Sequence, residues 1–132
     1  MMLLAAALLA SDDGDFEALS KGAANCNRPA VTHAWTEEVK RHSAFLLDSY
    51  RQQREIAEAR ADLAERRRKL RVGEAPAKGA TPDTEQSLAL VGATLTDRQA
   101  ALDDARTLDR EQQDMVGYFR QLYLTQCQGR AS

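Results

Sequence analysis

Ten residues in the middle of the chain, 73–82, constrain the fold most, because they separate two long segments of helical periodicity. Two Gly and two Pro punctuate this stretch, Gly-Glu-Ala-Pro-Ala-Lys-Gly-Ala-Thr-Pro, and such clusters are typical of turns. Two long helices joined by so short a connection must lie antiparallel. The sequence therefore predicts an all-α fold, a long antiparallel helical hairpin of coiled-coil type, occupying residues 32–132.

The first predicted helix spans about 34–72. Its apolar positions repeat every seven residues near the end, at Ile56, Leu63 and Leu70. This spacing is that of a coiled-coil seam. Thr36 suits the N-cap, and an earlier start with Pro29 at the first helical position is the alternative.

The second predicted helix spans about 83–126, with Thr81 and Pro82 as its N-cap and first position. One heptad series holds Leu88, Leu95, Leu102, Val116 and Tyr123, and a flank holds Leu108, Met115 and Leu122. A capping-box pattern begins at Thr96, shortly after Gly92. These two features predict a kink or break near Gly92–Thr96.

The two cysteines, Cys26 and Cys127, lie at nearly equal distances along the chain from the centre of the turn. In a hairpin they would face each other at the open end, so we expect a disulfide that closes it. Disulfides persist in oxidising compartments, which favours a periplasmic or secreted protein.

The N-terminus supports the same location. Residues 1–10 are an uncharged apolar run that stops at Ala10 before a polar segment, as in the hydrophobic region of a signal peptide. The alternatives are an ordinary buried N-terminal helix and a cytoplasmic protein. Residues 11–31 are polar and turn-rich, and we expect a loosely structured lead-in with at best a short helix over 16–24.

The aromatic residues are confined to the two ends of the chain, and none lies between residues 51 and 117. In a hairpin they would collect beside the cysteines. The candidate surface for a partner or for self-association comprises Trp35, Phe45, Leu47, Tyr50, Tyr118, Phe119 and Tyr123. Either residues 11–30 cover this surface, or it binds a protein partner or a second copy in a homodimeric four-helix base.

A basic run near the turn is the second candidate site. It comprises Arg66, Arg67, Arg68, Lys69 and Arg71. These residues could contact anionic lipid or a cell-wall polymer. The alternative is a solvated helix end whose cations suit the helix dipole, with Asp83 and Glu85 opposite. Nucleic acid is not an expected partner, because the net charge is −2 and the run lacks interleaved aromatic residues.

No catalytic signature is present in the sequence. It has no Gly-rich phosphate loop and no Gly-x-Ser-x-Gly, so we expect neither an enzyme nor a bound cofactor. A metal site built from Cys26, His33 and His42 is the weakest alternative, since the second helix offers no histidine.

The sequence therefore predicts a small exported helical-hairpin protein that acts as a non-catalytic protein-binding or assembly module. Two alternatives stay open at this point. One is a structural or accessory subunit of a cell-envelope complex. The other is a small metal-binding protein or enzyme that uses the Cys26/His33/His42 end.

Overall fold

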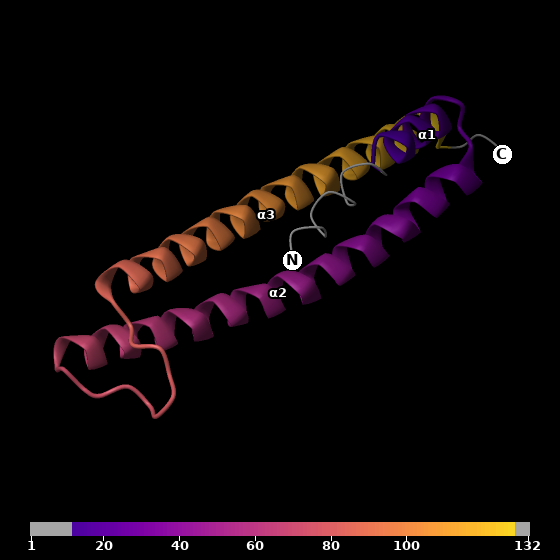
Figure 1. Ribbon diagram of the computed structural model, residues 1–132. Helices are drawn as coiled ribbons and strands as arrows, with labels where there is room; N and C mark the ends of the chain where they lie inside the picture. The colour runs from indigo at the N-terminus through magenta and orange to yellow at the C-terminus, as the bar shows by residue number, and fades with distance from the viewer. Residues whose placement is uncertain (1–11, 129–132) are drawn as a thin grey trace. The chain divides into compact units, whose positions relative to one another are not determined.

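The computed structural model describes residues 12–128, which form three helices (Figure 1). α1 spans Asp12–Ala24, α2 spans Arg28–Arg71 and α3 spans Glu85–Cys127. No strand occurs in this part of the chain, so the predicted all-α class is confirmed. The signal-peptide segment predicted at residues 1–10 lies outside the described residues.

The chain divides into two compact units. Within the described residues, unit 1 comprises residues 12–45 and 108–128, and unit 2 comprises residues 46–107. Each of the two long helices therefore contributes a segment to both units.

In unit 1, α1 is a packed helix rather than the loosely structured lead-in that the polar composition of residues 11–31 led us to expect. Leu19 and Ala23 are four residues apart and share one face of α1, where they are 3% and 0% exposed. They form the core of unit 1 with Val31 of α2 and Val116 of α3. This narrow face is enough to hold α1, because small side chains allow close helix approach.

The junction between α1 and α2 explains why the first long helix begins earlier than expected. α1 ends in a Schellman motif, with the N–H of Asn27 donating to Gly22 O at 2.8 Å and that of Cys26 to Ala23 O at 3.4 Å. Asn27 is then the N-cap of α2, since its side-chain Oδ1 accepts from the N–H of Ala30 at 3.2 Å.

The predicted N-cap at Thr36 is therefore wrong. The Thr36 hydroxyl donates to the carbonyl of Thr32 at 2.9 Å, one turn earlier in the same helix. The alternative start near Pro29 is closer to the observed one, and Pro29 occupies the second position of α2. A proline fits there because the N–H it lacks would have no partner within the helix.

The predicted disulfide between Cys26 and Cys127 is present, with the two Cα atoms 5.5 Å apart. It joins the α1–α2 junction to the last residue of α3. Cys26 has a φ of 54°, in the left-handed region that the residue after a helix commonly adopts. Glycine is the usual residue there, and the bond to Cys127 explains why this position carries a side chain.

In unit 2, the seams of α2 and α3 meet in a thin apolar core of Leu63, Leu88 and Leu95, with Ala59 and Val91 packed against it. Ile56 and Leu102 are also buried. Polar pairs flank the core, among them the reciprocal amide hydrogen bonds of Gln53 and Gln99 at 2.8 and 3.1 Å and the ion pair of Glu55 with Arg98 at 3.2 Å. These contacts join the two segments within unit 2.

The loop of unit 2 begins where the Gly of the turn motif predicts. Glu74 N–H donates to Lys69 O at 3.0 Å and Gly73 N–H to Leu70 O at 3.3 Å, which is a second Schellman motif. Gly73 has a φ of 70°, a conformation that glycine adopts without steric cost.

The predicted start of α3 at Thr81–Pro82 is wrong. Thr84 is the N-cap instead, because its Oγ1 accepts from the N–H of Ser87 at 3.0 Å while the Ser87 hydroxyl accepts from the N–H of Thr84 at 2.9 Å. This reciprocal pair is a capping box in which Ser replaces the usual Glu or Gln.

Of the kink or break predicted near Gly92–Thr96, the break is wrong, since α3 is continuous through these residues. The Thr96 hydroxyl donates to the carbonyl of Gly92 at 3.0 Å. It therefore bonds within the existing helix and does not start a new one.

Within the described residues, no helix is both long and apolar enough to cross a membrane.

Candidate interaction surfaces

A buried polar cluster joins α2 and α3 in unit 1. Glu38 and Asp109 are each 7% exposed. Arg41 bridges them, with Nε donating to Glu38 Oε2 at 2.8 Å and Nη2 donating to Asp109 Oδ1 at 2.9 Å. His42 Nδ1 lies 3.0 Å from Asp109 Oδ2, and Gln112 Nε2 donates to Glu38 at 3.3 Å. Every member has a partner.

The cluster has a structural role. A buried carboxylate is tolerated when charged donors satisfy it, and here one guanidinium serves two carboxylates. These bonds raise the pKa of Arg41 above its ordinary value, chiefly through the hydrogen bond to Glu38. Because the polar groups of α2 and α3 must meet one another, the cluster fixes how these segments align.

The candidate metal site loses its ligands in this structure. Cys26 is bonded to Cys127 and offers no thiolate. His42 is engaged by Asp109, and His33 is exposed on α2. Among the described residues, no three metal-ligating side chains come together.

The residues of the candidate aromatic surface do not form one surface. Some are half-buried in unit 1, one is exposed in unit 1, and two belong to unit 2. Trp35, Phe119 and Tyr123, together with Phe16 of α1, are half-buried against the core of unit 1. Arg120 lies over the Trp35 ring, with its Cζ 4.3 Å from the centroid. Two residues of α1, Leu19 and Ala23, belong to the core against which these rings pack.

Tyr118 is the aromatic residue of α3 that stays open to solvent, at 62% exposure, and its ring meets that of Phe119 edge-on at 5.3 Å. Phe45 is partly buried. Leu47 and Tyr50 belong to unit 2, where they line an open hollow together with Arg51, Arg54, Glu55 and Glu58.

An apolar stripe that the aromatic pattern of the sequence did not indicate lies beside Tyr118. Leu108 and Met115, seven residues apart on α3, are 54% and 46% exposed, and Tyr118 follows one turn later on the same side. The exposed Asp114 lies beside this stripe, and the exposed Glu111, three residues after Leu108 and four before Met115, lies on it between these two side chains. We call these five residues the α3 flank. The sequence signal was present, because Leu108 and Met115 form a second heptad series beside the buried one.

The basic run near the loop of unit 2 separates into paired and unpaired cations. Arg66 makes a two-point contact with Asp83, at 3.0 and 2.7 Å, and Arg68 makes one with Glu65, at 3.0 and 2.7 Å. These hydrogen bonds lower the pKa of Asp83 and of Glu65. They raise the pKa of Arg66 and of Arg68.

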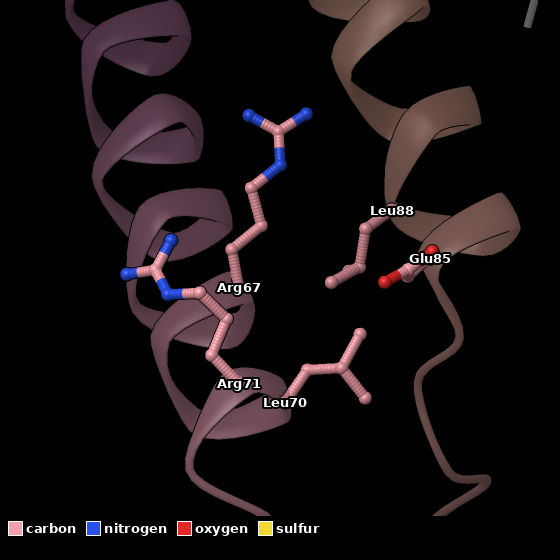
Figure 2. A pocket seen from close by; sticks show the side chains of 5 residues that line it. All are labelled: Arg67, Leu70, Arg71, Glu85 and Leu88. Carbon is pink, nitrogen blue, oxygen red and sulfur yellow. The ribbon is translucent and has the colours of Figure 1, made fainter.

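Arg67 and Arg71 make no ion pair within the described residues. Together with Leu70, Glu85 and Leu88 they line an open hollow of about 230 Å³. Figure 2 shows Leu70 and Leu88 pointing into this hollow from α2 and α3, while the Arg71 guanidinium lies on the side of α2 away from Leu88.

Comparisons with known proteins leave the function to be argued from these surfaces. No family model matches the chain, and neither the curated proteins nor the solved structures yield a significant match.

Proposed function

We propose that the protein is an exported, non-catalytic binding module, and that the α3 flank in unit 1 binds a basic amphipathic helix of a partner protein. The observation that carries this proposal is the uncovered apolar stripe of Leu108, Met115 and Tyr118. Met115 and Tyr118 are neighbours one turn apart on α3. Exposed apolar neighbours favour an interaction site, whereas apolar residues scattered singly are ordinary.

The spacing of the stripe suits a helical partner. Its residues follow one another at intervals of seven and three along α3, so they form a ridge that a second helix can pack against. Leu122, seven residues after Met115, is partly buried and extends the ridge toward the disulfide.

Charge determines the choice of partner. Glu111 and Asp114 are exposed and form no ion pair among the described residues. These carboxylates attract a helix whose apolar face is edged by Lys or Arg and repel one edged by Glu or Asp. A second copy of this chain would bring the same carboxylates against each other.

The antiparallel hairpin and export are part of the same proposal. The contacts within unit 2 and the disulfide of unit 1 support a chain that doubles back once. The hydrogen bond from the Thr96 hydroxyl to the Gly92 carbonyl supports a bend of α3 near Gly92, because side-chain bonds of this kind often bend helices. The disulfide supports an oxidising compartment.

The test is a titration of the disulfide-bonded full chain with a synthetic amphipathic helix of Leu and Lys, in which isothermal calorimetry measures the heat of binding. Met115→Lys should weaken binding about tenfold or more, because it places a cation inside the apolar contact. Leu90→Lys is the matched control, since Leu90 is 66% exposed in unit 2, and it should bind like the wild type.

Three results would contradict the proposal. A helix of Leu and Glu could bind as tightly as the basic one, or Met115→Lys could leave binding unchanged. Light scattering after size-exclusion chromatography could also reveal a dimer that Met115→Lys dissociates, which would make a second copy the occupant of the flank.

A further inference from the structure

The cations and carboxylates around the loop of unit 2 are unevenly paired. The acidic residues near the end of α2 and in the following loop are mostly engaged by two arginines. Arg66 binds Asp83 at 2.7 Å and approaches Asp62 at 3.7 Å. Arg68 binds Glu65 at 2.7 Å and approaches Glu74 at 3.7 Å.

Four cations at this end are left without an ion pair among the described residues, namely Arg67, Lys69, Arg71 and Lys78. Glu85 is the single nearby carboxylate outside the pairs. The loop stretch 75–82 contains no acidic residue and is exposed throughout. Over residues 62–85, six cations face five carboxylates, so the net charge of this end is only slightly positive, but most of its unpaired charged side chains are cations.

The cations are arranged around α2 and do not converge on one point. Arg67 and Arg71 are four residues apart on α2, yet Figure 2 shows the Arg67 guanidinium between α2 and α3 and the Arg71 guanidinium on the far side of α2. Lys69 lies two residues from each and so on a different side of the helix. A single small anion could contact only some of them. A surface that carries many mobile anions can contact all of them.

Apolar side chains lie among these cations. Val72 follows the last residue of α2 and is 64% exposed, and Leu70 is 37% exposed. Alternating basic and apolar residues are characteristic of segments that sit at the headgroup level of a bilayer. A nucleic acid would favour aromatic residues for stacking, and residues 51–117 contain none.

We propose that this end of unit 2 binds an anionic lipid surface, with Lys69, Arg71 and Lys78 contacting phosphate headgroups and Val72 inserting among them. The contact is peripheral and reversible, since a few cations and one apolar side chain provide modest affinity. This site is independent of the α3 flank, because it uses other residues, another unit and another partner.

The experiment is co-sedimentation of the disulfide-bonded full chain with two kinds of vesicle, phosphatidylcholine alone and phosphatidylcholine mixed with phosphatidylglycerol. We expect binding to the anionic vesicles only, and weaker binding as salt is raised. Lys69→Gln/Arg71→Gln should reduce the partition coefficient about 25-fold, at roughly fivefold for each cation. Val72→Asp should weaken binding as well, because it replaces the inserting apolar side chain by an anion.

Arg51→Gln/Arg110→Gln is the matched control, because it removes the same charge from two exposed arginines that form no ion pair in the described part of the chain. Its binding should stay within about twofold of the wild type. Circular dichroism checks that each variant keeps its helices.

Three outcomes would overturn the proposal: equal binding to neutral vesicles, an equal loss in the control variant, or binding of soluble polyphosphate as tight as that of the vesicles. The last result would assign the site to a free phosphate polymer. None of them bears on the peptide titration of the α3 flank, so the two proposals fail separately.

Discussion

His42 of α2 and Asp109 of α3 are in contact across unit 1, with Nδ1 of the histidine 3.0 Å from Oδ2 of the aspartate. Asp109 lies seven residues after Leu102 and seven before Val116, so it occupies a seam position that is otherwise apolar. Arg41 and His42 supply the donors that make this buried carboxylate tolerable.

Removing the Asp109 carboxylate should therefore destabilise the protein. We expect Asp109→Ala to lower the free energy of unfolding by about 3 kcal/mol, because Arg41 and His42 lose a buried partner and a small cavity remains. Urea denaturation followed by circular dichroism measures this loss. Asp114→Ala is the control, since that carboxylate is exposed, and its cost should stay within about 0.5 kcal/mol. Equal effects of the two substitutions would refute the structural role of the cluster.

The left-handed backbone at Cys26 predicts an unusual order among variants that lack the disulfide. Cys26→Ala/Cys127→Ala and Cys26→Gly/Cys127→Ala both open the same bridge, which spans 101 residues and stabilises by about 4–5 kcal/mol on the chain-entropy model. The Gly variant should be more stable than the Ala variant by about 1 kcal/mol, because glycine adopts positive φ without strain. Urea unfolding of the two double variants decides this. An Ala variant as stable as the Gly variant would show that the junction relaxes once the bridge is gone.

Two helical glycines should respond to alanine in opposite directions. A Cβ on Gly22 would lie 3.1 Å from Cβ of Ala30, between α1 and α2, whereas a Cβ on Gly117 meets nothing within 4 Å. Gly117→Ala should stabilise by about 1 kcal/mol through helix propensity. Gly22→Ala gains the same propensity but forces the helices apart, so it should destabilise by about 1 kcal/mol net. Thermal unfolding compares them, and a stabilised Gly22 variant would argue against close packing of α1.

The ion pair of Arg66 and Asp83 predicts a pH effect of definite sign. The guanidinium lowers the pKa of Asp83, so the contact adds stability above the ordinary aspartate pKa and loses it as pH falls through the lowered value. Carboxyl-carbon NMR should show Asp83 titrating below the usual range for aspartate. In Arg66→Gln the midpoint should return to that range. An unchanged midpoint would mean that the pair does not form in solution.

Features that depend on the arrangement of the sequence on either side of the central Gly/Pro cluster were predictable. The all-α class follows from two periodic segments around one Gly/Pro cluster, and the pairing of Cys26 with Cys127 follows from their positions around it. The end of α2 was also predictable, because Gly73 is the residue that a Schellman motif favours.

The helix starts and α1 were harder to predict, because several residues compete for each role. Thr36 and Thr81 have suitable side chains for N-caps, but Asn27 and Thr84 have the backbone partners that a cap needs. The packing of α1 depends on Leu19 and Ala23 meeting side chains about a hundred positions away, and local composition carries no record of that contact.

The candidate sites show the same division. The polar cluster had a signal, since Asp109 interrupts an apolar heptad series. Only one of the two ion pairs in the basic run had a sequence signal. Glu65 precedes Arg68 by three residues, which is the spacing of a pair on one helix face, whereas the Asp83 that binds Arg66 follows the loop. Which aromatic rings are covered depends on α1 and on Arg120, and that information comes only from the tertiary structure.

Asn27 belongs at once to the motif that ends α1 and to the cap that begins α2, while its neighbour Cys26 anchors the end of α3. An insertion of one residue between Ala24 and Arg28 would therefore disrupt a stop signal, a start signal and a covalent link together. An insertion in the loop at 75–82 would disrupt no such combination of helix end, helix start and disulfide, and lengthening a surface loop lowers the free energy of unfolding only slightly. Length variation among descendants of this chain should accordingly accumulate in that loop and spare the junction.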